Sequence, residues 1–476
     1  MSFNGKHITV AGLGVSGVSA ARALAGLGAR VTVVDGGEGQ ALRERAASLE
    51  AAGIAVRLGD ADTLPEGTGL VVTSPGWKPE SPLFAAAAEA GVAVVGDVEI
   101  AWQLREEKHP GKAAPWLAVT GTNGKTTTVQ MLASILEAAG LRTAAVGNIG
   151  TPIIDVVLGE QQYDVLAVEL SSYQLHWAPS LRPHSAAVLN LAPDHLDWHG
   201  SMAAYAADKG RIYEGNQVAC VYNVEDPATE RLVMAADVEE GCRAIGFTLG
   251  APGPSMLGVV EGLLVDRAFV PDRHTSAQEL AEVSDIKPAA PHNIANALAA
   301  AALARAFGVE AAAVREGLRA FRPDAHRIAH VADVDGVAYV DDSKATNTHA
   351  AQASLAAYES IVWIAGGLAK GATFDELVAA SAKRLRGAVL IGADRALIRE
   401  ALARHAPDVP VVDLERTDTG AMAAAVREAA RIAGPGDTVL MAPACASMDM
   451  FTNYNKRGEA FAEAVRALAA GRGTDE

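Results

Sequence analysis

The chain has 476 residues, of which 50% are hydrophobic and 20% charged, and its formal net charge is −17 at pH 7. This acidic balance argues against nucleic acid or an anionic membrane surface as a partner, and the length predicts about three domains. The most apolar helical run, Ala297 to Ala304, ends at Arg305 and is too short to span a bilayer. The composition, with 46 glycines, is typical of an α/β protein.

The first block predicts a β-α-β unit that binds a nucleotide. A strand at residues 7–14 precedes a helix from about Val15 to Leu27, and a second strand ends at Asp35. Gly12, Gly14 and Gly17 form the pattern G-x-G-x-x-G, which places a pyrophosphate at the helix N-terminus. A nicotinamide dehydrogenase is the commonest interpretation of this pattern, and we keep it as an alternative.

The second block follows a polar stretch, Arg105 to Pro115, that we interpret as a linker. Its strands alternate with helices and predict a mostly parallel sheet, with an excursion by a hairpin and a closing helix. The expected strands lie at residues 116–120, 164–170, 185–191 and 218–223, the hairpin within 246–272 and the closing helix at 292–308.

A third α/β block follows a second linker, Phe321 to Arg327. Its expected strands lie at residues 337–343, 360–367, 387–392, 409–414 and 437–444. We therefore predict domains at residues 1–110, 111–322 and 323–476. Residues 322–324 are expected to act as a hinge, and residues 471–476 to be disordered.

A phosphate-binding turn is the most informative feature of the second block. The apolar strand end leads into the sequence T-G-T-N-G-K-T-T, which opens a helix that we expect from Thr127 to Ala139. Gly121 and Gly124 let backbone N–H groups approach a phosphate chain, Lys125 adds positive charge, and Thr126 offers a hydroxyl to Mg²⁺. The longer pattern G-x-x-x-x-G-K-[ST] is not met, because a valine occupies its first glycine position.

The order of motifs along the chain resembles the Mur ligases over all three blocks. The markers are GTNGKTT (121–127), GNIG (147–150), VELSSYQL (168–175), DHLD (194–197), HNIANALAA (292–300), DDSKATN (341–347), GGLAKG (366–371) and SMDMFTNYNKRG (447–458). The resemblance implies an α/β protein with a Rossmann-like N-terminal domain, a central P-loop domain and a Rossmann-like C-terminal domain. It also implies an ATP-dependent amide ligase that joins D-glutamate to UDP-N-acetylmuramoyl-L-alanine through an acyl phosphate, in peptidoglycan biosynthesis.

The same resemblance implies the residues that bind ATP and metal. The ATP-binding set is Gly121, Thr122, Asn123, Gly124, Lys125, Thr126, Thr127, Asn296, Arg327 and Asp342. Two Mg²⁺ ions are implied, held by Thr126, Glu169, His195 and a carbamylated Lys209, and the catalytic set is Lys125, Glu169, His195 and Lys209. Without the resemblance, an N-cap for the following helix remains an alternative role for Glu169, and a solvated helix lysine is the ordinary interpretation of Lys209.

Two further sets are implied for the other substrates. The UDP-substrate set is Val15, Ser16, Asp35, Ser74, Gly76 and Asn148. The D-glutamate set is Lys344, Thr346, Lys370, Ser447 and Tyr454. Many relatives have phenylalanine where this chain has Tyr454, so we expect a backbone contact there rather than a role for the hydroxyl.

Three alternatives accompany this interpretation: another Mur ligase or folylpolyglutamate synthase, the nicotinamide dehydrogenase, and a non-enzymatic nucleotide switch. The dehydrogenase leaves Lys125 unexplained, and the switch leaves the cations at residues 344 and 370 without a task. We further expect a monomer in the cytoplasm. The N-terminus lacks a signal-peptide pattern, and Cys220, Cys242 and Cys445 are too widely spaced for a disulfide framework.

Overall fold

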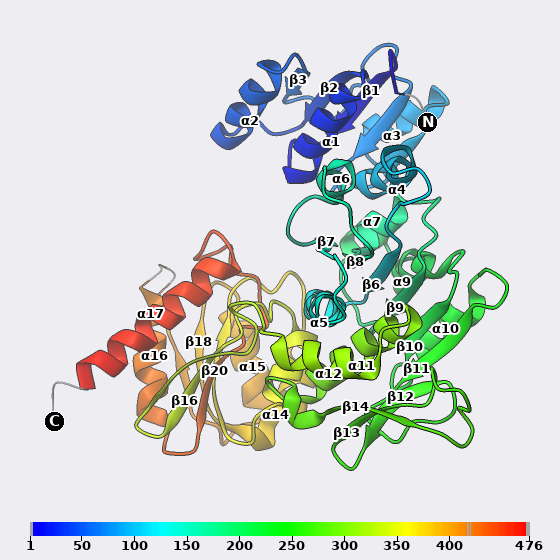
Figure 1. Cartoon of the computed structure of the whole chain (residues 1–476). Helices are drawn as coiled ribbons and strands as arrows, with labels where there is room; N and C mark the ends of the chain where they lie inside the picture. The colour runs from blue at the N-terminus through cyan, green and yellow to red at the C-terminus, as the bar shows by residue number, and fades with distance from the viewer. Residues whose placement is uncertain (1–2, 417, 419, 473–476) are drawn as a thin grey trace. The chain divides into compact units, whose positions relative to one another are not determined.

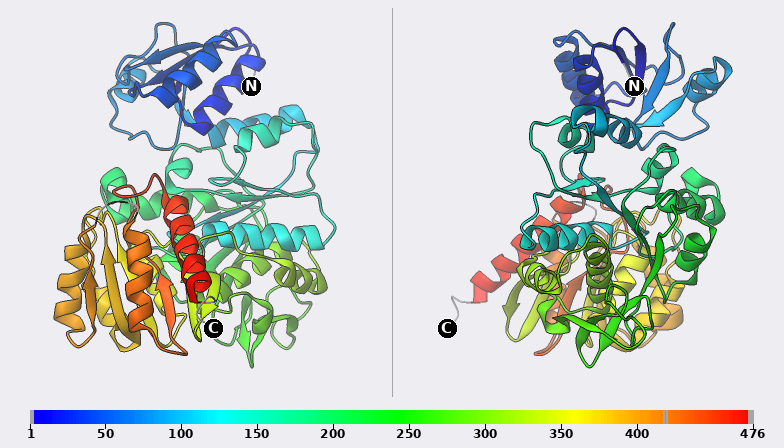
Figure 2. Two further views of the ribbon diagram at one scale, coloured as in Figure 1. Left: turned by 90° about the vertical axis from the view of Figure 1, so that its left-hand side faces the viewer. Right: turned by 45° about the vertical axis from the view of Figure 1, so that its right-hand side comes forward.

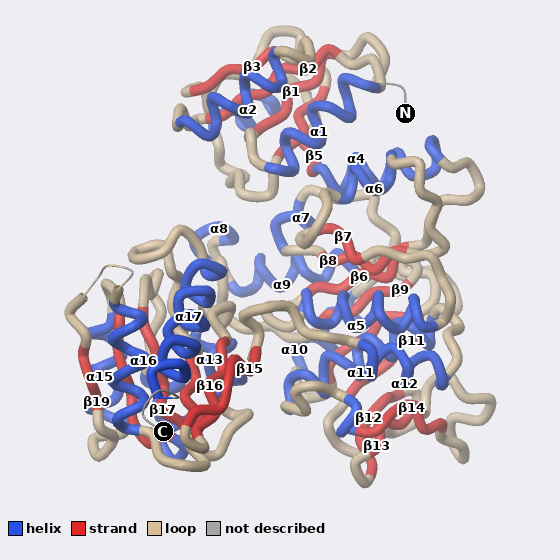
Figure 3. Tube along the Cα trace, turned by 60° about the vertical axis from the view of Figure 1, so that its left-hand side comes forward, coloured by secondary structure: helices blue, strands red, loops and turns tan. Residues whose placement is uncertain are grey.

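The structure is a computed structural model that describes residues 3–416, 418 and 420–472 (Figure 1). The chain divides into two compact units, the first of residues 1–286 and 294–321, the second of residues 287–293 and 322–476. Three separate sheets, each flanked by helices, confirm the predicted α/β class (Figure 3). Among the described residues, no helix combines the length and the apolar character needed to cross a membrane.

The first sheet is entirely parallel, with strand order β3-β2-β1-β4-β5. Its strands are β1 (His7–Ala11), β2 (Arg30–Asp35), β3 (Ala55–Leu58), β4 (Leu70–Thr73) and β5 (Val94–Gly96), and its helices are α1 (Val15–Gly26), α2 (Gln40–Glu50), α3 (Pro82–Glu89) and α4 (Asp97–Lys108). A side chain at Gly17 would place its Cβ 1.9 Å from the carbonyl oxygen of Gly12, so only glycine lets α1 approach the turn this closely.

The predicted first linker begins too early. Residues Arg105–Lys108 belong to the last turn of α4, and the irregular segment starts only at His109. Arg105 and Lys108 are basic residues in that last turn, where a positive charge interacts favourably with the helix dipole, and this local effect extends the helix into a stretch that is polar in sequence.

The second sheet has nine strands in the order β14-β13-β12-β11-β10-β9-β6-β8-β7. Its strands are β6 (Trp116–Thr120), β7 (Ala145–Gly147), β8 (Leu166–Glu169), β9 (Ser185–Val188), β10 (Ala219–Asn223), β11 (Arg243–Phe247), β12 (Met256–Val260), β13 (Leu263–Asp266) and β14 (Gln278–Glu282). The predicted hairpin is confirmed in β12 and β13. Instead of leaving the main sheet, as predicted, it extends that sheet, because β12 pairs with β11. Strand β14 adds an antiparallel edge that was not predicted.

Helices cover this second sheet and connect its parallel strands. They are α5 (Lys125–Ala138), α6 (Ile153–Leu158), α7 (Ser172–His176), α8 (Leu196–His199), α9 (Met202–Gly210), α10 (Pro227–Ala235), α11 (Pro291–Ala306) and α12 (Ala311–Ala320), with short 3₁₀ turns at Arg211–Tyr213 and Val283–Asp285. The β6 strand is buried along its whole length between β9 and β8, as expected for a central parallel strand.

The third sheet has the order β15-β16-β20-β17-β18-β19 and is parallel except for β15. Its strands are β15 (Ala329–Val334), β16 (Val337–Asp341), β17 (Ile361–Gly366), β18 (Leu385–Ile391), β19 (Val411–Asp413) and β20 (Thr438–Met441), and its helices are α13 (Thr348–Leu355), α14 (Asp375–Ser381), α15 (Arg395–His405), α16 (Ala421–Ile432) and α17 (Tyr454–Arg472), with a 3₁₀ turn at Ala382–Arg384. The β15 strand was not predicted.

The C-terminal helix α17 packs beside α16 and the β15 strand (Figure 2). Because α17 extends to Arg472, the expected disorder of residues 471–476 is wrong for its first two residues. The remaining residues, 473–476, lie outside the described part of the chain.

The cysteines are free thiols, as the sequence predicts, but two of them lie closer than their spacing indicates. The Sγ atoms of Cys220 and Cys242 are 3.9 Å apart, because β10 and the entry to β11 run side by side. A separation of 22 residues in sequence therefore becomes a direct contact.

The helix that follows the phosphate-binding turn is held by an unusually close helix contact. A Cβ atom at Gly317 in α12 would lie 2.4 Å from the Cα of Ile135 in α5, and the Ser134 hydroxyl donates a hydrogen bond of 2.7 Å to the Gly317 carbonyl. The missing side chain at residue 317 thus sets how closely α12 packs against α5.

We expect Gly317→Ala to destabilise the protein although alanine favours helices. Overpacking costs about 1–3 kcal/mol, whereas replacing glycine in a helix gains up to about 1 kcal/mol. The thermal midpoint should fall by about 2 °C or more, as followed by circular dichroism. Gly26→Ala is the matched control, since a Cβ there meets nothing within 4 Å and the midpoint should hold or rise. An equal response of the two variants would contradict the proposed packing constraint.

Candidate active site

The phosphate-binding turn joins β6 to α5 and is anchored from the neighbouring β9 side. The N–H of Thr122 donates to the carbonyl of Asn190 at 3.0 Å, and the N–H of Asn123 donates to the Asn190 side-chain oxygen at 2.9 Å. Gly124 has a φ of +85°, and a Cβ there would lie 2.4 Å from the side-chain oxygen of Asn296. The turn therefore needs glycine for both its conformation and its contact with α11.

Two lysine side chains converge on one carbonyl oxygen in this turn. Lys125 Nζ donates to Gly121 O at 2.9 Å and to Thr122 O at 2.9 Å, and Lys209 Nζ donates to Gly121 O at 2.8 Å. Lys209, on α9, is 1% exposed. Burial lowers the pKa of Lys209 well below its usual value, and the ammonium of Lys125 lowers it further. The sequence-only interpretation of Lys209 as a solvated helix lysine is therefore wrong.

Glu169 ends β8, and its buried carboxylate raises the pKa of Lys209 by electrostatic attraction, against the effect of burial. One oxygen, Oε1, accepts a hydrogen bond of 2.9 Å from the Asn148 side chain, whereas Oε2 is buried with no hydrogen-bond partner in the described structure. The alternative of an N-cap is wrong, because Ser171 caps α7 in a reciprocal capping box with Gln174. An orphaned carboxylate oxygen on this edge fits a cation ligand.

His195 lies in the loop after β9, in a backbone conformation with a φ of +54°. Its ring packs on the Tyr173 ring, with centroids 4.9 Å apart. Burial lowers the pKa of His195, and Lys125 and Lys209 lower it further, against the opposing effect of Asp194. A neutral imidazole is the form that binds a metal ion.

A network of two histidines around one carboxylate adjoins Lys209 and was not predicted. Asp208 lies within hydrogen-bond distance of His176 Nδ1 and His199 Nδ1, both at 2.9 Å, and His199 Nε2 lies 2.9 Å from the Ser172 hydroxyl. These contacts tie α9 to α7 and α8, the short helices that follow β8 and β9. No short sequence motif indicates these contacts, because the paired residues are separated by 9, 27 and 32 positions.

The first Gly-rich turn is closed by Asp35. Its two carboxylate oxygens accept hydrogen bonds from the N–H groups of Leu13, at 2.7 Å, and Gly37, at 2.8 Å. Val15 is 66% exposed at the start of α1, and the Ser74 hydroxyl lies 3.4 Å from Gly12 O. The structure therefore brings together Val15, Asp35 and Ser74 of the predicted UDP-substrate set.

The loop after β4 reaches the loop after β9 within the first unit. It contains Gly76, where open space surrounds the position of a Cβ, followed by Trp77 and Lys78. The indole N–H of Trp198 donates to Trp77 O at 3.1 Å, and Lys78 Nζ donates to Asp197 O at 2.8 Å. The loop after β4 thus contacts α8, the short helix that begins directly after His195.

Asp97 is a buried carboxyl that the sequence interpretation missed. It begins α4, is 4% exposed, and receives a hydrogen bond from the Ser16 side chain, while its Oδ1 atom has no partner in the described structure. Burial raises the pKa of Asp97 to about 6. Its position behind the first Gly-rich turn depends on the contact between α4 and α1.

In the second unit, Asp342 is also buried. Its side chain accepts a hydrogen bond from the Ser354 hydroxyl and another, at 3.3 Å, from the N–H of Ile328. Burial raises the pKa of Asp342 to about 6, and the nearby Arg327 acts in the opposite direction. The structure therefore places Arg327 and Asp342 near each other, with the carboxylate engaged by protein groups.

Four of the five residues in the predicted D-glutamate set follow three strands that are neighbours in the third sheet. Lys344 and Thr346 follow β16, Ser447 follows β20, and Lys370 follows β17. The Lys344 ammonium lies 4.0 Å from the centroid of the Tyr454 ring, at the start of α17. The aromatic ring at residue 454 thus has a cation–π contact that sequence reasoning did not foresee.

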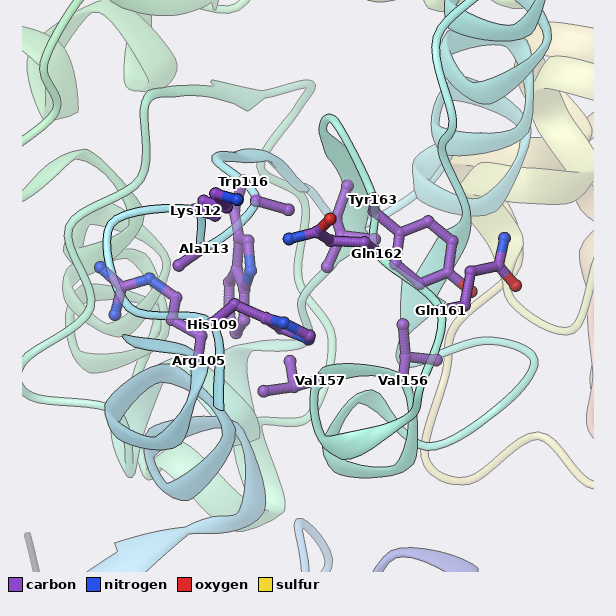
Figure 4. A pocket seen from close by; sticks show the side chains of 12 residues that line it. Arg105, His109, Lys112, Ala113, Trp116, Val156, Val157, Gln161, Gln162 and Tyr163 are labelled. Carbon is purple, nitrogen blue, oxygen red and sulfur yellow. The ribbon is translucent and has the colours of Figure 1, made fainter. Parts of the chain in front are cut away.

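A further pocket in the first unit is separate from all of these residues (Figure 4). It lies among α4, α6 and the start of β6, and its polar lining includes Arg105, His109 and Lys112. None of the predicted site residues lines it. The candidate site is therefore defined by side-chain chemistry at the strand ends rather than by this cavity.

The parallel strand ends, the phosphate-binding turn and the buried lysine define an α/β protein of the P-loop type. Family models match three segments: Mur ligase MurD-like, N-terminal domain (6–96), Mur ligase middle domain (119–304) and Mur ligase, glutamate ligase domain (326–445). Together they cover most of the sequence, and the chain belongs to the Mur ligase family. The exact domain boundaries predicted above stay predictions.

Curated relatives resemble the chain over nearly its whole length. The UDP-N-acetylmuramoylalanine–D-glutamate ligase of Streptomyces coelicolor is 81% identical over 98% of this chain and 99% of its own length. The enzyme of that name from Thermobifida fusca is 60% identical over 98% of this chain and all of its own. Among solved structures, the UDP-N-acetylmuramate–alanine ligase of Thermotoga maritima has a TM-score of 0.56 at 18% identity, covering 97% of this chain and 99% of that one. The latter likeness shows the fold alone.

Asp97 generates a prediction about stability and pH. Its folded-state pKa of about 6 lies above the ordinary 3.8, so the folded state binds the proton more tightly, and stability is lost as pH rises through this range. We therefore expect Asp97→Asn to raise the thermal midpoint at pH 7.5 by roughly 2–5 °C, an advantage that shrinks as the pH falls towards 4.

Asp164→Asn is the control with the opposite sign. The Arg142 guanidinium lowers the pKa of Asp164 to about 2, so ionisation of that carboxyl favours the folded state at neutral pH. This variant should gain no stability at pH 7.5. A midpoint for Asp97→Asn that stays below the wild-type value at every pH would contradict the assignment.

Proposed function

We propose that this chain is an ATP-dependent amide ligase that adds D-glutamate to UDP-N-acetylmuramoyl-L-alanine, through an acyl phosphate, in peptidoglycan biosynthesis. The observation that carries the chemistry is the convergence of Lys125 and Lys209 on one phosphate-binding turn, with the Glu169 carboxylate near enough to Lys209 to act on its pKa. The choice of substrates rests on the relatives named UDP-N-acetylmuramoylalanine–D-glutamate ligase, which match 98% of the chain.

The reaction must convert a poor electrophile into a good one. A carboxylate oxygen of the UDP-substrate attacks the γ-phosphorus of ATP, and ADP leaves. The amine of D-glutamate then attacks the acyl carbon, phosphate leaves, and the amine loses its proton. The protein contributes alignment and positive charge, supplied by Lys125 and by the backbone N–H groups at the start of α5.

The residues at this edge also fit two Mg²⁺ ions. The Thr126 hydroxyl and the orphaned Glu169 Oε2 would hold one ion, and His195 with a carbamylated Lys209 the other. When bound, Mg²⁺ neutralises charge on the phosphate oxygens. In the described chain no three His, Cys, Asp or Glu side chains form a metal site by themselves, so the ions depend on substrate oxygens and on modification of Lys209.

The remaining predicted residues take roles within this proposal. Thr122, Asn123 and Thr127 bind the ATP phosphates at the phosphate-binding turn, and Asn296 binds the nucleotide near the adenine. Arg327 is assigned to the ATP phosphates and Asp342 to the ribose. The UDP part is held at the first Gly-rich turn, with Asn148 lining the path to the reacting carboxyl. D-Glutamate binds at Lys344, Thr346, Lys370, Ser447 and Tyr454. The enzyme acts as a monomer in the cytoplasm. Its free thiols are consistent with that compartment, where cysteines stay reduced.

One assay tests the proposal. ADP release with UDP-N-acetylmuramoyl-L-alanine should require D-glutamate among the amino acids, without any change in nicotinamide absorbance. Lys125→Ala should lower turnover by at least roughly 10²-fold, because it removes charge that stabilises the transferred phosphoryl group. Lys108→Ala, which removes an equal charge from a surface ion pair with Glu160, should leave turnover unchanged. ADP release that responds equally to other amino acids would overturn the choice of acceptor.

The buried amine of Lys209 generates a second prediction. Its lowered pKa raises the fraction of neutral amine, which is the form that reacts with CO₂. Removal of CO₂ should therefore reduce activity, and bicarbonate should restore it. Lys209→Ala should lose acyl-phosphate formation but keep ATP binding, and bicarbonate should have no effect on it. Full wild-type activity after thorough CO₂ removal, with an unmodified lysine by mass spectrometry, would refute carbamylation.

A further inference from the structure

Arg457 is a completely buried guanidinium in the first turn of α17, with 0% exposure. Its Nε donates to the Ser343 hydroxyl at 3.0 Å, its Nη2 to the Ser343 carbonyl at 2.9 Å, and its Nη1 to the Cys445 carbonyl at 3.1 Å. All three acceptors are uncharged oxygens, and Asp341 and Asp449 act on the guanidinium only through longer-range attraction. A charge is thus buried on backbone and hydroxyl groups.

The acceptors of the Arg457 guanidinium belong to the loops after β16 and β20, and both loops carry predicted D-glutamate residues. Ser343 immediately precedes Lys344 in the loop after β16, and Cys445 lies two residues before Ser447 in the loop after β20. The Ser343 hydroxyl also donates to Tyr454 O at 2.7 Å, which closes a ring back to α17. The guanidinium therefore fixes both loops relative to the Tyr454 ring that contacts the Lys344 ammonium.

The loop after β17, which carries Lys370, is connected to Arg457 through the loop after β20. Leu368 and Ala446 exchange two backbone hydrogen bonds of 2.9 Å each, so the loop that carries Lys370 follows the position of Cys445. Next to Arg457, a Cβ at Gly458 would lie 2.1 Å from the His326 ring, and His326 O in turn accepts a hydrogen bond of 3.1 Å from the N–H of Lys344. The arginine–glycine pair is thus the point where all these segments meet.

Burying a cation has a large desolvation cost, so a contribution to stability is a poor explanation for a buried arginine. Burial lowers the pKa of Arg457 to about 10, so the group stays charged at neutral pH. Its desolvation is offset by neutral acceptors and by the longer-range attraction of Asp341 and Asp449, without a direct ion pair. The planar guanidinium, however, donates in several fixed directions at once, which suits it to hold separate backbones in one arrangement.

We propose that Arg457 is a positioning residue for the amino-acid acceptor: it holds the loops of Lys344, Ser447 and Lys370 in the geometry that binds a dicarboxylate. The inference rests on the proposed function for the identity of the acceptor. Arg457 contacts no reacting atom in this role, so its loss affects binding of D-glutamate and leaves the chemistry at the phosphate-binding turn in place.

Steady-state kinetics of Arg457→Lys test the proposal. The lysine keeps the charge but lacks the fork of donors, so the KM for D-glutamate should rise by about 10-fold or more. The KM for ATP and for the UDP-substrate should stay within about 2-fold, and single-turnover ADP formation in the absence of D-glutamate should match the wild type. A merely structural role would lower all activities together through the amount of folded enzyme.

Two further variants keep the test decisive. Ser343→Ala removes one acceptor of the guanidinium with little change in volume, and it should raise the KM for D-glutamate by about 3-fold. This variant provides the test if Arg457→Lys does not fold. Arg305→Lys alters another largely buried arginine, paired with Asp266 in the first unit at 3.0 Å, and should leave the KM for D-glutamate unchanged.

The outcomes separate the two proposals. If the wild type releases ADP with D-glutamate, and neither Arg457→Lys nor Ser343→Ala changes its KM, the positioning role is wrong while the proposed function stands. If the wild type does not use D-glutamate at all, the proposed function fails instead. A rise in the KM for D-glutamate that Arg305→Lys reproduces would also contradict the positioning role, because it would reflect general loss of stability.

Discussion

Two amines donate to the carbonyl oxygen of Gly121, and the candidate active site is organised around that contact. Lys125 reaches it from α5, and the buried Lys209 reaches it from α9, so two amines that carry like charge when protonated lie close to each other. The repulsion is part of the reason why the pKa of Lys209 is lowered. Such a site is satisfied by anions, and phosphate oxygens or conversion of one amine into a carbamate would both relieve it.

Parallel sheets explain why residues from distant segments meet at these sites. Strands β8, β6 and β9 are adjacent, so Glu169, the phosphate-binding turn and the loop before His195 emerge at the same edge. In the second unit the adjacent strands β16, β20 and β17 bring together the loops of Lys344, Ser447 and Lys370 in the same way. In both units the candidate site residues thus lie at the carboxyl ends of parallel strands, where ligands generally bind in open α/β sheets.

The sequence predicted what local chemistry determines. Strand, turn and helix follow one another around Gly12 and around Gly124, since close backbone approach requires glycine, and the class of fold follows from that alternation. It did not predict β14 or β15, because an antiparallel edge depends on pairing with a strand already in place. Asp97, the pair around Asp208 and the bonds of Arg457 were missed for a related reason: each depends on helices and loops brought together only by the tertiary fold.

The contact between α12 and α5 has an evolutionary consequence. The backbone at Ile135 occupies the space that any side chain at residue 317 would need, and the Ser134 hydroxyl is bonded to the carbonyl of that same residue. Positions 134 and 317 are therefore not free to diverge independently. Among homologous sequences, a side chain at residue 317 should appear only where compensating replacements let α5 and α12 move apart, whereas the exposed positions of α12 should vary more freely.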